Sequence, residues 1–281
     1  MSEQGAVSHL AYDWMIVTYF FLGGLSVGAY LFSVAANYCK QEYKPLAKKS
    51  AVLSLIALAI GLLILLYDLG QPLRAWRLFV SFNPKSMLSW GVWFLNIFGL
   101  MNLIYTTLLF KTNESVAKKF AYAGLPFAIL TATYTAMLLA QAPGRELWHT
   151  ALLPVLFLNG AIISGLALIM LFSITEENTK LLSKLGRFVA WLIILELGMI
   201  FSEIIILLNG GTESAAVAKF LFSGKIGGLF LGFEIILGAI VPVVILLRTK
   251  TNVFSQAVAS LLILIGIFTM RYVIVVGGQL I

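Results

Sequence analysis

The chain has 281 residues, of which 60% are hydrophobic and 11% are charged, and its formal net charge is +7. Soluble domains carry about 25% charged residues. The composition therefore predicts an integral membrane protein, excludes a soluble globular enzyme, and argues against reading the positive charge as nucleic-acid binding.

Eight apolar runs follow one another along the chain, and each is long enough to cross a bilayer. A hydrocarbon core of about 30 Å requires about 20 apolar residues in a helix. The runs lie at 14–38, 50–68, 88–110, 119–141, 150–174, 187–208, 225–247 and 252–276. Uninterrupted runs do not fit the alternating pattern of a membrane barrel. We therefore expect an all-α fold of eight transmembrane helices, with short loops between antiparallel neighbours.

The loops differ strongly in their positive charge. Twelve of the 19 lysines and arginines lie in the loops after the first, third, fifth and seventh runs, six lie in the opposite loops, and Arg271 lies within the last run. Cytoplasmic loops of membrane proteins carry the excess of Lys and Arg. We therefore expect both termini to be extracytoplasmic, together with the outer loops at 69–87, 142–149 and 209–224.

Histidine and cysteine are too scarce for a resident metal centre. The single cysteine, Cys39, cannot hold an iron–sulfur cluster or a thiolate zinc site. A haem with two histidine ligands is not expected, because His9 precedes the first apolar run and His149 lies in a loop or at a helix start. We expect no metal, haem or iron–sulfur cluster in this protein, so that any redox metal belongs to a partner.

A weak internal repeat links the two halves of the sequence. The stretch "FLGGLSVGA" (21–29) resembles "FLNGAIISGLA" (157–167), and the four runs between them give both helices the same direction. This pattern favours two four-helix bundles related by an axis along the membrane normal. We expect an N-terminal tail at 1–13, a first bundle at 14–141 and a second bundle at 142–281. The alternative is that small residues recur wherever membrane helices pack closely.

Gly24 and Gly28 form a GxxxG motif in the first apolar run. Such a motif lets two helix backbones approach each other closely, and structural packing is the first interpretation. The second interpretation is that the two glycines make room for a flat ring, which would assign them to a cofactor-binding site.

Four ionisable residues lie within the last three apolar runs. Glu196 and Glu203 are seven residues apart and share one helix face, whereas Glu234 and Arg271 belong to the next two helices. Ionisable groups within spans are costly and usually face the protein interior or a cavity. One interpretation is a proton path or polar pocket. The other is an ion pair of Arg271 with Glu203 or Glu234, which leaves Glu196 without an obvious basic partner.

A second polar group is predicted in the first half of the sequence. Tyr19, Asp68 and Tyr134 all lie within about two turns of the expected outer surface. Two phenols and a carboxylate suit the carbonyl or hydroxyl of a quinone, because they donate, accept and pass protons. Alternatively, Tyr19 belongs to an interfacial aromatic belt, and Asp68 pairs with Arg74 or Arg77 to hold the outer loop.

Four stretches together resemble one known family. They are "FLGGLSVGAYL" (21–31), "DLGQPLRAWRLFVSFNPKSMLSWGVW" (68–93), "YTAMLLAQAPGRELWHTALLPVLFLNGAIISG" (134–165) and "RYVIVVGGQ" (271–279). In this order they are similar to the NrfD/PsrC family, the quinone-interacting membrane subunits of polysulfide-reductase-like respiratory complexes. The 68–93 block and the terminal arginine-to-glutamine stretch are the more specific parts.

The resemblance implies a fold, a cofactor and partners. The fold is eight helices in two bundles, within the cytoplasmic membrane of a prokaryote. The cofactor is a membrane quinone, menaquinone or ubiquinone, bound in the first bundle. The partners are an extracytoplasmic ferredoxin-like iron–sulfur subunit and a molybdopterin catalytic subunit, besides membrane lipid. The outer loops would form the docking surface, with Arg74, Arg77 and Arg145 as contacts to an acidic partner or to lipid headgroups.

The resemblance also implies roles for individual residues. Tyr134 matches the family tyrosine that contacts the quinone. Tyr19 occupies a position where some members carry histidine, and a family asparagine one turn earlier corresponds to a site near Ile16, where that contact is lost. With Asp68 and Tyr134 as acceptors of protons, the expected function is electron exchange between the quinone pool and the iron–sulfur subunit of an oxidoreductase for a sulfur compound or another inorganic substrate. Chemistry on that substrate would occur in another subunit.

Two other functional classes remain open at this point. Eight helices, an internal repeat and buried carboxylates also suit a proton-coupled secondary transporter. Against this class, no pair of corresponding spans is broken by mid-helix glycine or proline, and Pro242 is isolated. The other alternative is a passive membrane anchor without a quinone site.

Overall fold

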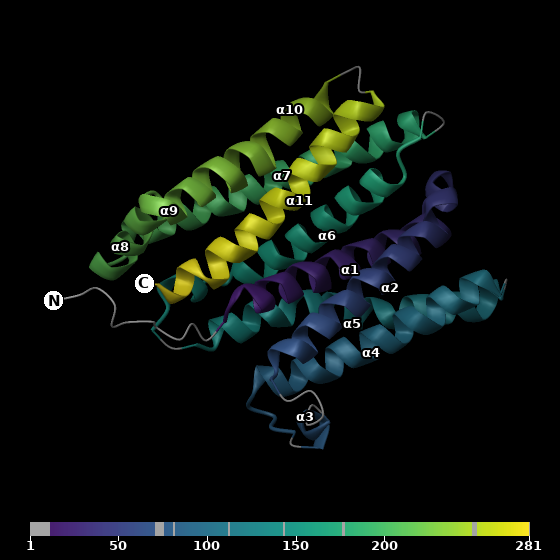
Figure 1. The fold of residues 1–281 in the computed structure, drawn as a ribbon, viewed down its shortest axis with the longest axis horizontal. Coiled ribbons are helices and arrows are strands. Elements are labelled where there is room, and N and C mark those ends of the chain that lie inside the picture. The colour runs from purple at the N-terminus through teal and green to yellow at the C-terminus, as the bar shows by residue number, and fades with distance from the viewer. Residues whose placement is uncertain are drawn as a thin grey trace.

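The computed structural model is built from helices, and it contains no strand among the residues that it describes (Figure 1). The described residues are 12–70, 76–80, 82–111, 113–142, 144–175, 178–248 and 252–280. Within them, eight helices are long and apolar enough to cross a membrane. The predicted all-helical fold with eight spans is thereby confirmed. His9, Arg74 and Lys250 lie outside the described residues.

The spanning helices alternate with short helical segments in the loops. In chain order the elements are α1 (Trp14–Tyr38), η1 (Gln41–Tyr43), α2 (Lys44–Asp68), α3 (Arg77–Val80), α4 (Met87–Phe110), α5 (Glu114–Ala140), η3 (Glu146–Trp148), α6 (Leu153–Phe172), α7 (Thr179–Asn209), α8 (Thr212–Leu221), α9 (Gly224–Gly227), η4 (Gly228–Ile240), α10 (Val241–Leu247), α11 (Val253–Val275) and η5 (Gly277–Gln279). The seventh span is formed jointly by α9, η4 and α10.

Two spans begin six or more residues earlier than the apolar pattern predicts. The helix α2 starts at Lys44 instead of residue 50, and α7 starts at Thr179 instead of residue 187. Both extensions are rich in lysine, whose apolar stem packs along the helix while the ammonium group reaches water. The apolar run is therefore shorter than the helix that contains it.

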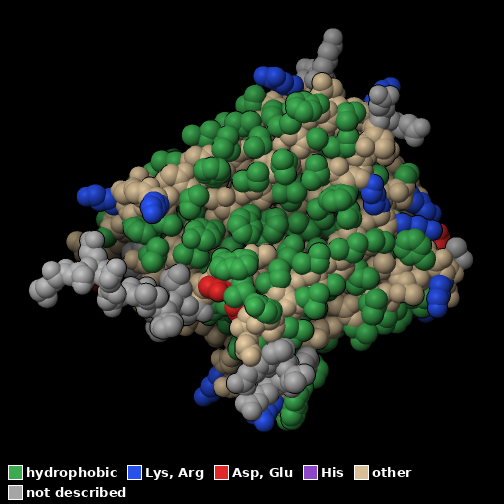
Figure 2. Space-filling model, viewed as in Figure 1, with side chains coloured by type: hydrophobic (Ala, Val, Ile, Leu, Met, Phe, Trp, Pro, Cys, Tyr) green, Lys and Arg blue, Asp and Glu red, His purple; other side chains and the backbone are tan. Residues whose placement is uncertain are grey.

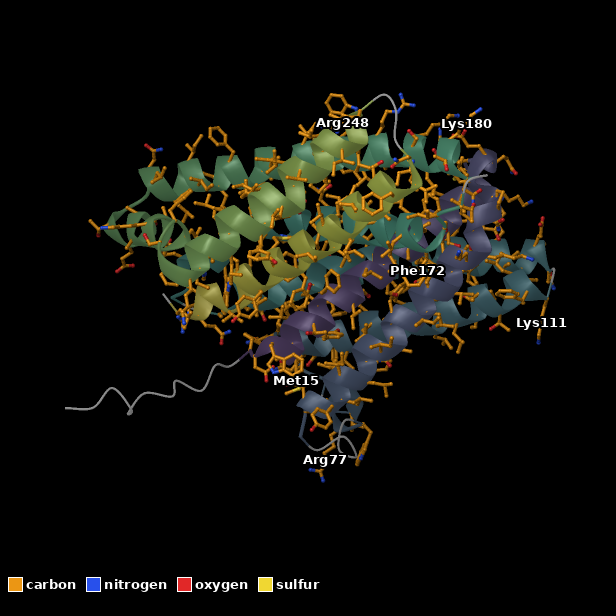
Figure 3. The ribbon with its side chains drawn as sticks, turned by 45° about the horizontal axis from the view of Figure 1, so that its top comes forward. Met15, Arg77, Lys111, Phe172, Lys180 and Arg248 are labelled. Carbon is orange, nitrogen blue, oxygen red and sulfur yellow. The ribbon has the colours of Figure 1, made fainter. Side chains whose placement is uncertain are left out.

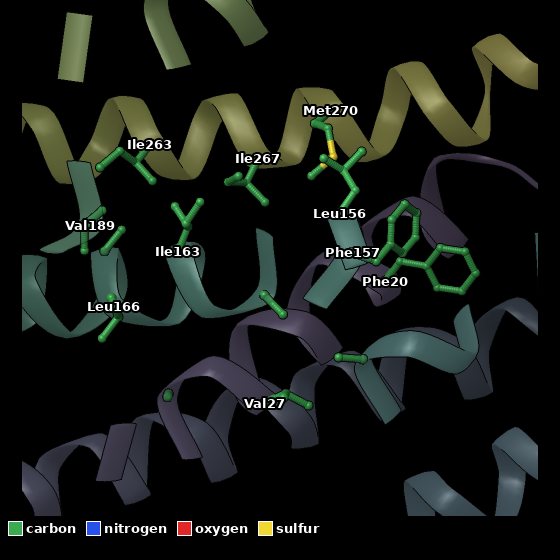
Figure 4. Close-up of a cluster of buried hydrophobic side chains, with 14 of the residues drawn as sticks. Phe20, Val27, Leu156, Phe157, Ile163, Leu166, Val189, Ile263, Ile267 and Met270 are labelled. Carbon is green, nitrogen blue, oxygen red and sulfur yellow. The ribbon is translucent and has the colours of Figure 1, made fainter. Parts of the chain in front are cut away.

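The helices α1 and α6 pack against each other at the centre of the molecule. A Cβ added to Gly28 would lie 2.0 Å from the carbonyl oxygen of Ala161, and one added to Gly165 would lie 2.4 Å from the backbone nitrogen of Ala29. Only glycine permits this approach of two backbones. The two similar stretches of the sequence therefore form one tight contact. Figure 4 shows the apolar side chains around it, with Val27 on α1 and Ile163 on α6.

The start of α1 and the end of α11 lie at the same end of the molecule, here called the terminal end (Figure 1). There the side-chain amide of Gln279 accepts a hydrogen bond from the backbone of Tyr12 at 3.0 Å and donates one to it at 2.8 Å. Arg145 donates to the carbonyl of Gln279 at 2.8 Å. Through these hydrogen bonds, Gln279 connects the end of α11 with two other segments, the residues just before α1 and the loop before α6.

Trp148 completes this junction. Its indole nitrogen donates to the carbonyl of Ile274 at 2.7 Å. A Cβ added to Gly278 would lie only 2.2 Å from the same nitrogen, so glycine is required where the indole packs against η5. Tyr12 meets the indole edge-on, with ring centroids 6.1 Å apart. The terminal stretch 271–279 therefore ends α11 and also holds the segments of Tyr12, Arg145 and Trp148 together.

The molecular surface has the distribution of a membrane protein. In Figure 2 hydrophobic side chains cover most of the visible face, whereas Lys and Arg gather toward its margins. Figure 3 shows Met15 and Arg77 toward the terminal end, and Lys111, Lys180 and Arg248 toward the opposite end. A wide apolar belt between polar ends matches the eight spans.

One span departs from regular α-helix. Residues Gly228–Ile240 form a π-helix of 13 residues, η4, in which the wider turn leaves Gly238 against the backbone of Gly266 on α11. Most π-helical segments are single-turn bulges, and they are frequent at functional sites. The apolar pattern predicted a span here and gave no signal for its widened geometry. Glu234 lies within this segment.

Candidate functional site

Two buried tyrosines meet inside the first group of helices. Tyr19 of α1 and Tyr134 of α5 are 3% and 4% exposed, and their hydroxyl groups are hydrogen-bonded to each other. The N-terminal cap of α1 is Asp13, so Tyr19 lies about 9 Å along the helix from the terminal end. The pair therefore places two hydroxyl groups inside the protein, close to the terminal end.

Glycines on two neighbouring helices seat the tyrosine rings. A Cβ added to Gly91 of α4 would lie 2.2 Å from Cε2 of Tyr134, so the ring occupies the space that a side chain would fill. A Cβ added to Gly61 of α2 would lie 3.8 Å from Cδ2 of Tyr19. The position of Tyr134 thus depends on the absence of a side chain at residue 91.

A small cavity lies beside Tyr19 and extends toward α11. It encloses about 10 Å³. Its lining comes from α1, α5 and α11 and includes Phe20, Gly23, Gly24, Thr131, Ala132, Thr135 and Arg271. The Thr135 hydroxyl donates to the carbonyl of Ala132 at 3.1 Å. The hydroxyl of Thr131 has no hydrogen-bond partner within the described residues.

Arg271 brings a buried charge to this lining, and it is 2% exposed. Its Nη2 donates to the carbonyl of Phe157 at 2.7 Å, and its guanidinium carbon lies 3.5 Å from the centroid of the Phe157 ring. Cation–π contact and one hydrogen bond stabilise the buried charge in part. Among the residues that the structure describes, Nε and Nη1 have no hydrogen-bond partner.

Three carboxylates form a row on the other side of Arg271. Glu203 and Glu234 line one cavity of about 30 Å³, and Glu234 and Glu196 line a second of about 10 Å³. Glu196 is the acid in electrostatic contact with Arg271. The residues described here contain no group of three or more His, Cys, Asp or Glu side chains arranged to hold a metal ion. We call Glu203, Glu234 and Glu196 the carboxylate row.

Comparison with known proteins places these features in a family. The family model described as "Polysulphide reductase, NrfD" matches residues 3–281. The chain belongs to the NrfD family. It is 28% identical to a polysulfide reductase chain of Wolinella succinogenes, over 96% of this sequence and 95% of that protein. It is 24% identical to a selenate reductase subunit of Mesobacillus selenatarsenatis, over 98% of this sequence and 76% of that protein.

A third relative comes from Archaeoglobus fulgidus. The Hdr-like menaquinol oxidoreductase integral membrane subunit of that organism is 26% identical over 91% of this sequence and 68% of that protein. The NrfD family thus contains membrane subunits of several oxidoreductase complexes. The present protein is accordingly a multi-pass integral membrane protein of this family.

The predicted tyrosine–carboxylate group is only partly assembled in this NrfD-family protein. Tyr19 and Tyr134 meet, and Tyr19 is buried, so the interfacial-belt interpretation is wrong. Asp68 is half-exposed at the end of α2, and its charged neighbour is Asp13. It forms no ion pair with Arg77 within the described residues, and Arg74 lies outside them. Asp68 therefore lies nearer to the terminal end than the tyrosine pair.

The two glycines of the GxxxG motif have different surroundings. Gly28 lies against the backbone of Ala161, which is close helix packing. A Cβ added to Gly24 would lie 3.6 Å from Nη2 of Arg271 and 3.4 Å from Cβ of Ala161. Gly24 therefore borders the cavity of Tyr19, whereas Gly28 belongs to the contact between α1 and α6.

The ion pair predicted for Arg271 is not formed. Neither Glu203 nor Glu234 lies within ion-pair distance of Arg271 among the described residues, where the ion pairs join Lys44 with Glu114 and Lys184 with Glu42 at the surface. The acid facing Arg271 is Glu196, the residue that seemed to lack a basic partner. Helix periodicity assigned each group to a helix and a face but not the direction in which the arginine side chain extends.

Sequence reasoning missed Thr131, Gly91 and Gly160 as parts of the site. A Cβ added to Gly160 of α6 would lie 3.5 Å from Oε1 of Glu196 and 3.6 Å from Nη2 of Arg271. A small residue in a membrane helix usually signals packing, and threonine usually bonds its own helix. Neither residue type therefore carries a sequence signal that separates a site from ordinary packing.

Proposed function

We propose that this protein is the quinone-reactive membrane subunit of a respiratory oxidoreductase. It exchanges electrons between the quinone pool and an extracytoplasmic iron–sulfur subunit. The observation that carries the proposal is the buried hydroxyl pair of Tyr19 and Tyr134. Burying a phenol hydroxyl is costly unless it is hydrogen-bonded, and each of these two hydroxyls can bond either the other or a polar ligand.

The chemistry of the hydroxyl pair suits a quinone. A quinone has a flat apolar ring with an acceptor oxygen at each end, and a phenol hydroxyl is a donor that also accepts. Tyr134 of α5 and Tyr19 of α1 supply two such hydroxyls. A ligand oxygen would bond one or both of them and replace the hydrogen bond that they form with each other. On oxidation, a quinol releases two electrons and two protons. The tyrosine hydroxyls position the ring oxygen and pass its proton onward.

We propose that Asp68 accepts the proton that the tyrosine hydroxyls pass toward the terminal end. Asp68 lies near Asp13 at the terminal end, where it is half-exposed and within reach of water. The tyrosines thereby act inside the apolar region and the carboxylates act at its edge. We assign the catalytic roles to Tyr134 and Asp68, and ligand contacts to Tyr19, Tyr134 and Gly24. Gly28 supports the site only through helix packing.

The terminal end is proposed to face the extracytoplasmic side. The excess of lysine and arginine on the opposite loops supports this orientation. The junction of Arg145, Trp148 and Gln279 gives this end a fixed structure suited to docking a partner. A ferredoxin-like iron–sulfur subunit docked there would lie close to the tyrosine pair, and a molybdopterin subunit would act on the terminal substrate, an inorganic compound of the sulfur or selenium type.

The helices are proposed to form two bundles, at 14–141 and 142–281. The tyrosine pair belongs to the first bundle, and the carboxylate row belongs to the second. We further propose that Glu203, Glu234 and Glu196 conduct protons between the terminal end and Arg271. Adjacent cavities along the row and the π-helix around Glu234 support this role. The quinone is a menaquinone or ubiquinone, and one relative is named for menaquinol.

The test removes one hydroxyl from the complex isolated with its native partner subunits. Tyr134→Phe should lower quinol turnover about 100-fold, the usual contribution of a positioned proton-transfer group. Tyr105→Phe is the matched control, because Tyr105 is fully buried but bonds Ser33 at 3.0 Å, away from the pair. Equal turnover in the wild type and Tyr134→Phe would remove Tyr134 from the site. Isolation without an iron–sulfur partner, with substrate transport insensitive to quinone analogues, would favour a transporter instead.

A further inference from the structure

Unsatisfied polar groups from two helices face the same small cavity. Thr131 of α5 and Arg271 of α11 are 3% and 2% exposed, and both line the cavity beside Tyr19. The Thr131 hydroxyl and two nitrogens of Arg271, Nε and Nη1, have no hydrogen-bond partner within the described residues. Buried polar groups normally have partners, and an unmade bond to a charged group is especially costly. The arrangement therefore points to a bound polar atom.

The cavity has the size and chemistry for one oxygen. Its volume of about 10 Å³ holds about one water-sized atom. The guanidinium of Arg271 donates and never accepts, and the Thr131 hydroxyl donates as well as accepts. The occupant must therefore accept hydrogen bonds. An oxygen bearing partial negative charge is the group that satisfies both residues.

Arg271 also links this cavity to the carboxylate row. On one side, a Cβ added to Gly24 of α1, the helix of Tyr19, would lie 3.6 Å from Nη2. On the other side, a Cβ added to Gly160 would lie 3.5 Å from Oε1 of Glu196 and 3.6 Å from the same Nη2. That oxygen of Glu196 has no hydrogen-bond partner among the described residues. One buried charge thus stands between the two regions.

We propose that Thr131 and Arg271 form an oxygen-binding subsite of the tyrosine cavity, and that Arg271 couples the occupancy of this subsite to the charge of Glu196. The proposal rests on the quinone function proposed above. The subsite takes an oxygen of a quinone-type ligand, or a water molecule that such a ligand hydrogen-bonds. The arginine acts by positioning and charge, and it transfers no electron.

The first experiment measures equilibrium binding to the intact complex, by fluorescence quenching of two probes. One probe is 2-heptyl-4-hydroxyquinoline N-oxide, and the other is its parent without the N-oxide oxygen. Thr131→Val should weaken binding of the N-oxide about fivefold, as expected for one lost hydrogen bond. Thr133→Val is the matched control, because Thr133 lies on the same helix and bonds the carbonyl of Ile129 at 3.0 Å.

The two probes distinguish the source of the oxygen. If Thr131→Val weakens the N-oxide more than the parent compound, the ligand's own oxygen occupies the subsite. If it weakens both equally, the subsite holds the 4-oxygen that both probes carry or a water molecule bonded to it. If it weakens neither, the subsite is refuted, while a loss of binding in Tyr134→Phe would still support the quinone site. If the wild-type complex binds neither probe, the proposed function itself fails.

The second experiment tests the coupling with a double-mutant cycle on binding of the N-oxide. Arg271→Gln should weaken binding about tenfold, and Arg271→Lys, which keeps the charge, should recover part of it. Glu196→Gln should strengthen binding about threefold, because the arginine's field is no longer offset by a neighbouring carboxylate. In the Arg271→Gln background, Glu196→Gln should have no effect. Equal effects of Glu196→Gln in both backgrounds would overturn the coupling.

If Arg271→Gln disrupts assembly, Gly160→Ala provides an independent arm. The added methyl group would enter the space between Glu196 and Arg271 while both charges remain, and the nearest obstacle is the flexible end of Met270, 2.8 Å away. The expected result is that Glu196→Gln changes probe affinity less in the Gly160→Ala background than in the wild type. An unchanged effect would contradict a link through this position.

Discussion

The tyrosine pair and the carboxylate row differ in whether their buried polar groups have hydrogen-bond partners. Tyr19 and Tyr134 bond each other between regular α-helices. In the carboxylate row, one oxygen of Glu196 and one of Glu234 have no partner among the described residues, and Glu234 lies in a π-helix. A pre-formed hydroxyl pair suits the positioning of a ligand, whereas buried carboxylates without partners suit groups that take up and release protons.

In the proposed function the two regions depend on each other. A quinone site exchanges protons as well as electrons, and the tyrosine pair by itself leads only to the terminal end, where Asp13 and Asp68 lie. Arg271 connects the pair's cavity with Glu196, and Glu234 continues the row to Glu203. Four predictions separate the contributions of the regions.

The strongest effect is expected from Gly91→Ala, which disturbs the tyrosine pair alone. The new methyl group would lie 2.2 Å from the ring of Tyr134, so the ring must move and the hydroxyl pair must break. Turnover should fall about 100-fold, as for loss of a positioned proton-transfer group. The control is Gly99→Ala on the same helix, where the nearest atom, in Leu58, is 3.4 Å away. Full activity of Gly91→Ala would mean that ring position is unimportant.

The next effect is expected from Gly28→Ala, which disturbs the contact between the regions. The methyl group would lie 2.0 Å from the carbonyl oxygen of Ala161, and neither backbone can yield easily. The free energy of unfolding should fall by about 1–3 kcal/mol, seen as a lower Tm in thermal denaturation. At Gly23 the nearest atom is 4.0 Å away, so Gly23→Ala should leave Tm nearly unchanged. Equal Tm values for both variants would refute the close contact of α1 and α6.

A smaller effect is expected from Glu234→Gln, which disturbs the carboxylate row alone. The amide cannot release a proton, so turnover of the complex in sealed vesicles should fall about tenfold, less than the usual effect of a group that transfers a proton at the reacting atoms. Affinity for a quinone analogue should stay unchanged, because Glu234 does not line the cavity of Tyr19. Glu213→Gln, at an exposed site in α8, is the control. A large loss of analogue affinity in Glu234→Gln would merge the two regions into one site.

The smallest effect is expected from Trp148→Phe, which loosens the junction at the terminal end. The variant loses the hydrogen bond from the indole to the carbonyl of Ile274, at a cost of about 1 kcal/mol. Tm should fall by a few degrees while analogue binding persists. Trp191→Phe is the matched control, because Trp191 is 64% exposed. A Trp148→Phe variant as stable as this control would show that the junction contributes nothing measurable.

The sequence was most informative where the bilayer fixes the length and the composition of a segment. Eight apolar runs predicted eight spanning helices, because the hydrocarbon thickness fixes both length and composition. The glycines shared by 21–29 and 157–167 predicted close packing, and those stretches meet across α1 and α6. The tyrosines at positions 19 and 134 were expected near each other because both lie at similar depth, and they are hydrogen-bonded.

The sequence was least informative about directions across the bundle. Arg271 was expected to pair with Glu203 or Glu234, but its side chain extends toward α6 and the cavity beside Tyr19. Depth follows from counting residues, whereas the choice of partner depends on helix rotation and rotamer. The π-helix at Glu234 was invisible for a related reason, since its composition is that of any apolar span.

The most direct test of the central claim is the position of a bound quinone. A photoreactive azido-quinone would be irradiated with the native complex, and the labelled peptides would be identified by mass spectrometry with and without excess unlabelled quinone. Displaceable label should appear on α1 and α5, in the peptides that contain Tyr19 and Tyr134. Displaceable label confined to α7 and η4, in the peptides that contain Glu196 and Glu234, would contradict a quinone site at the tyrosine pair.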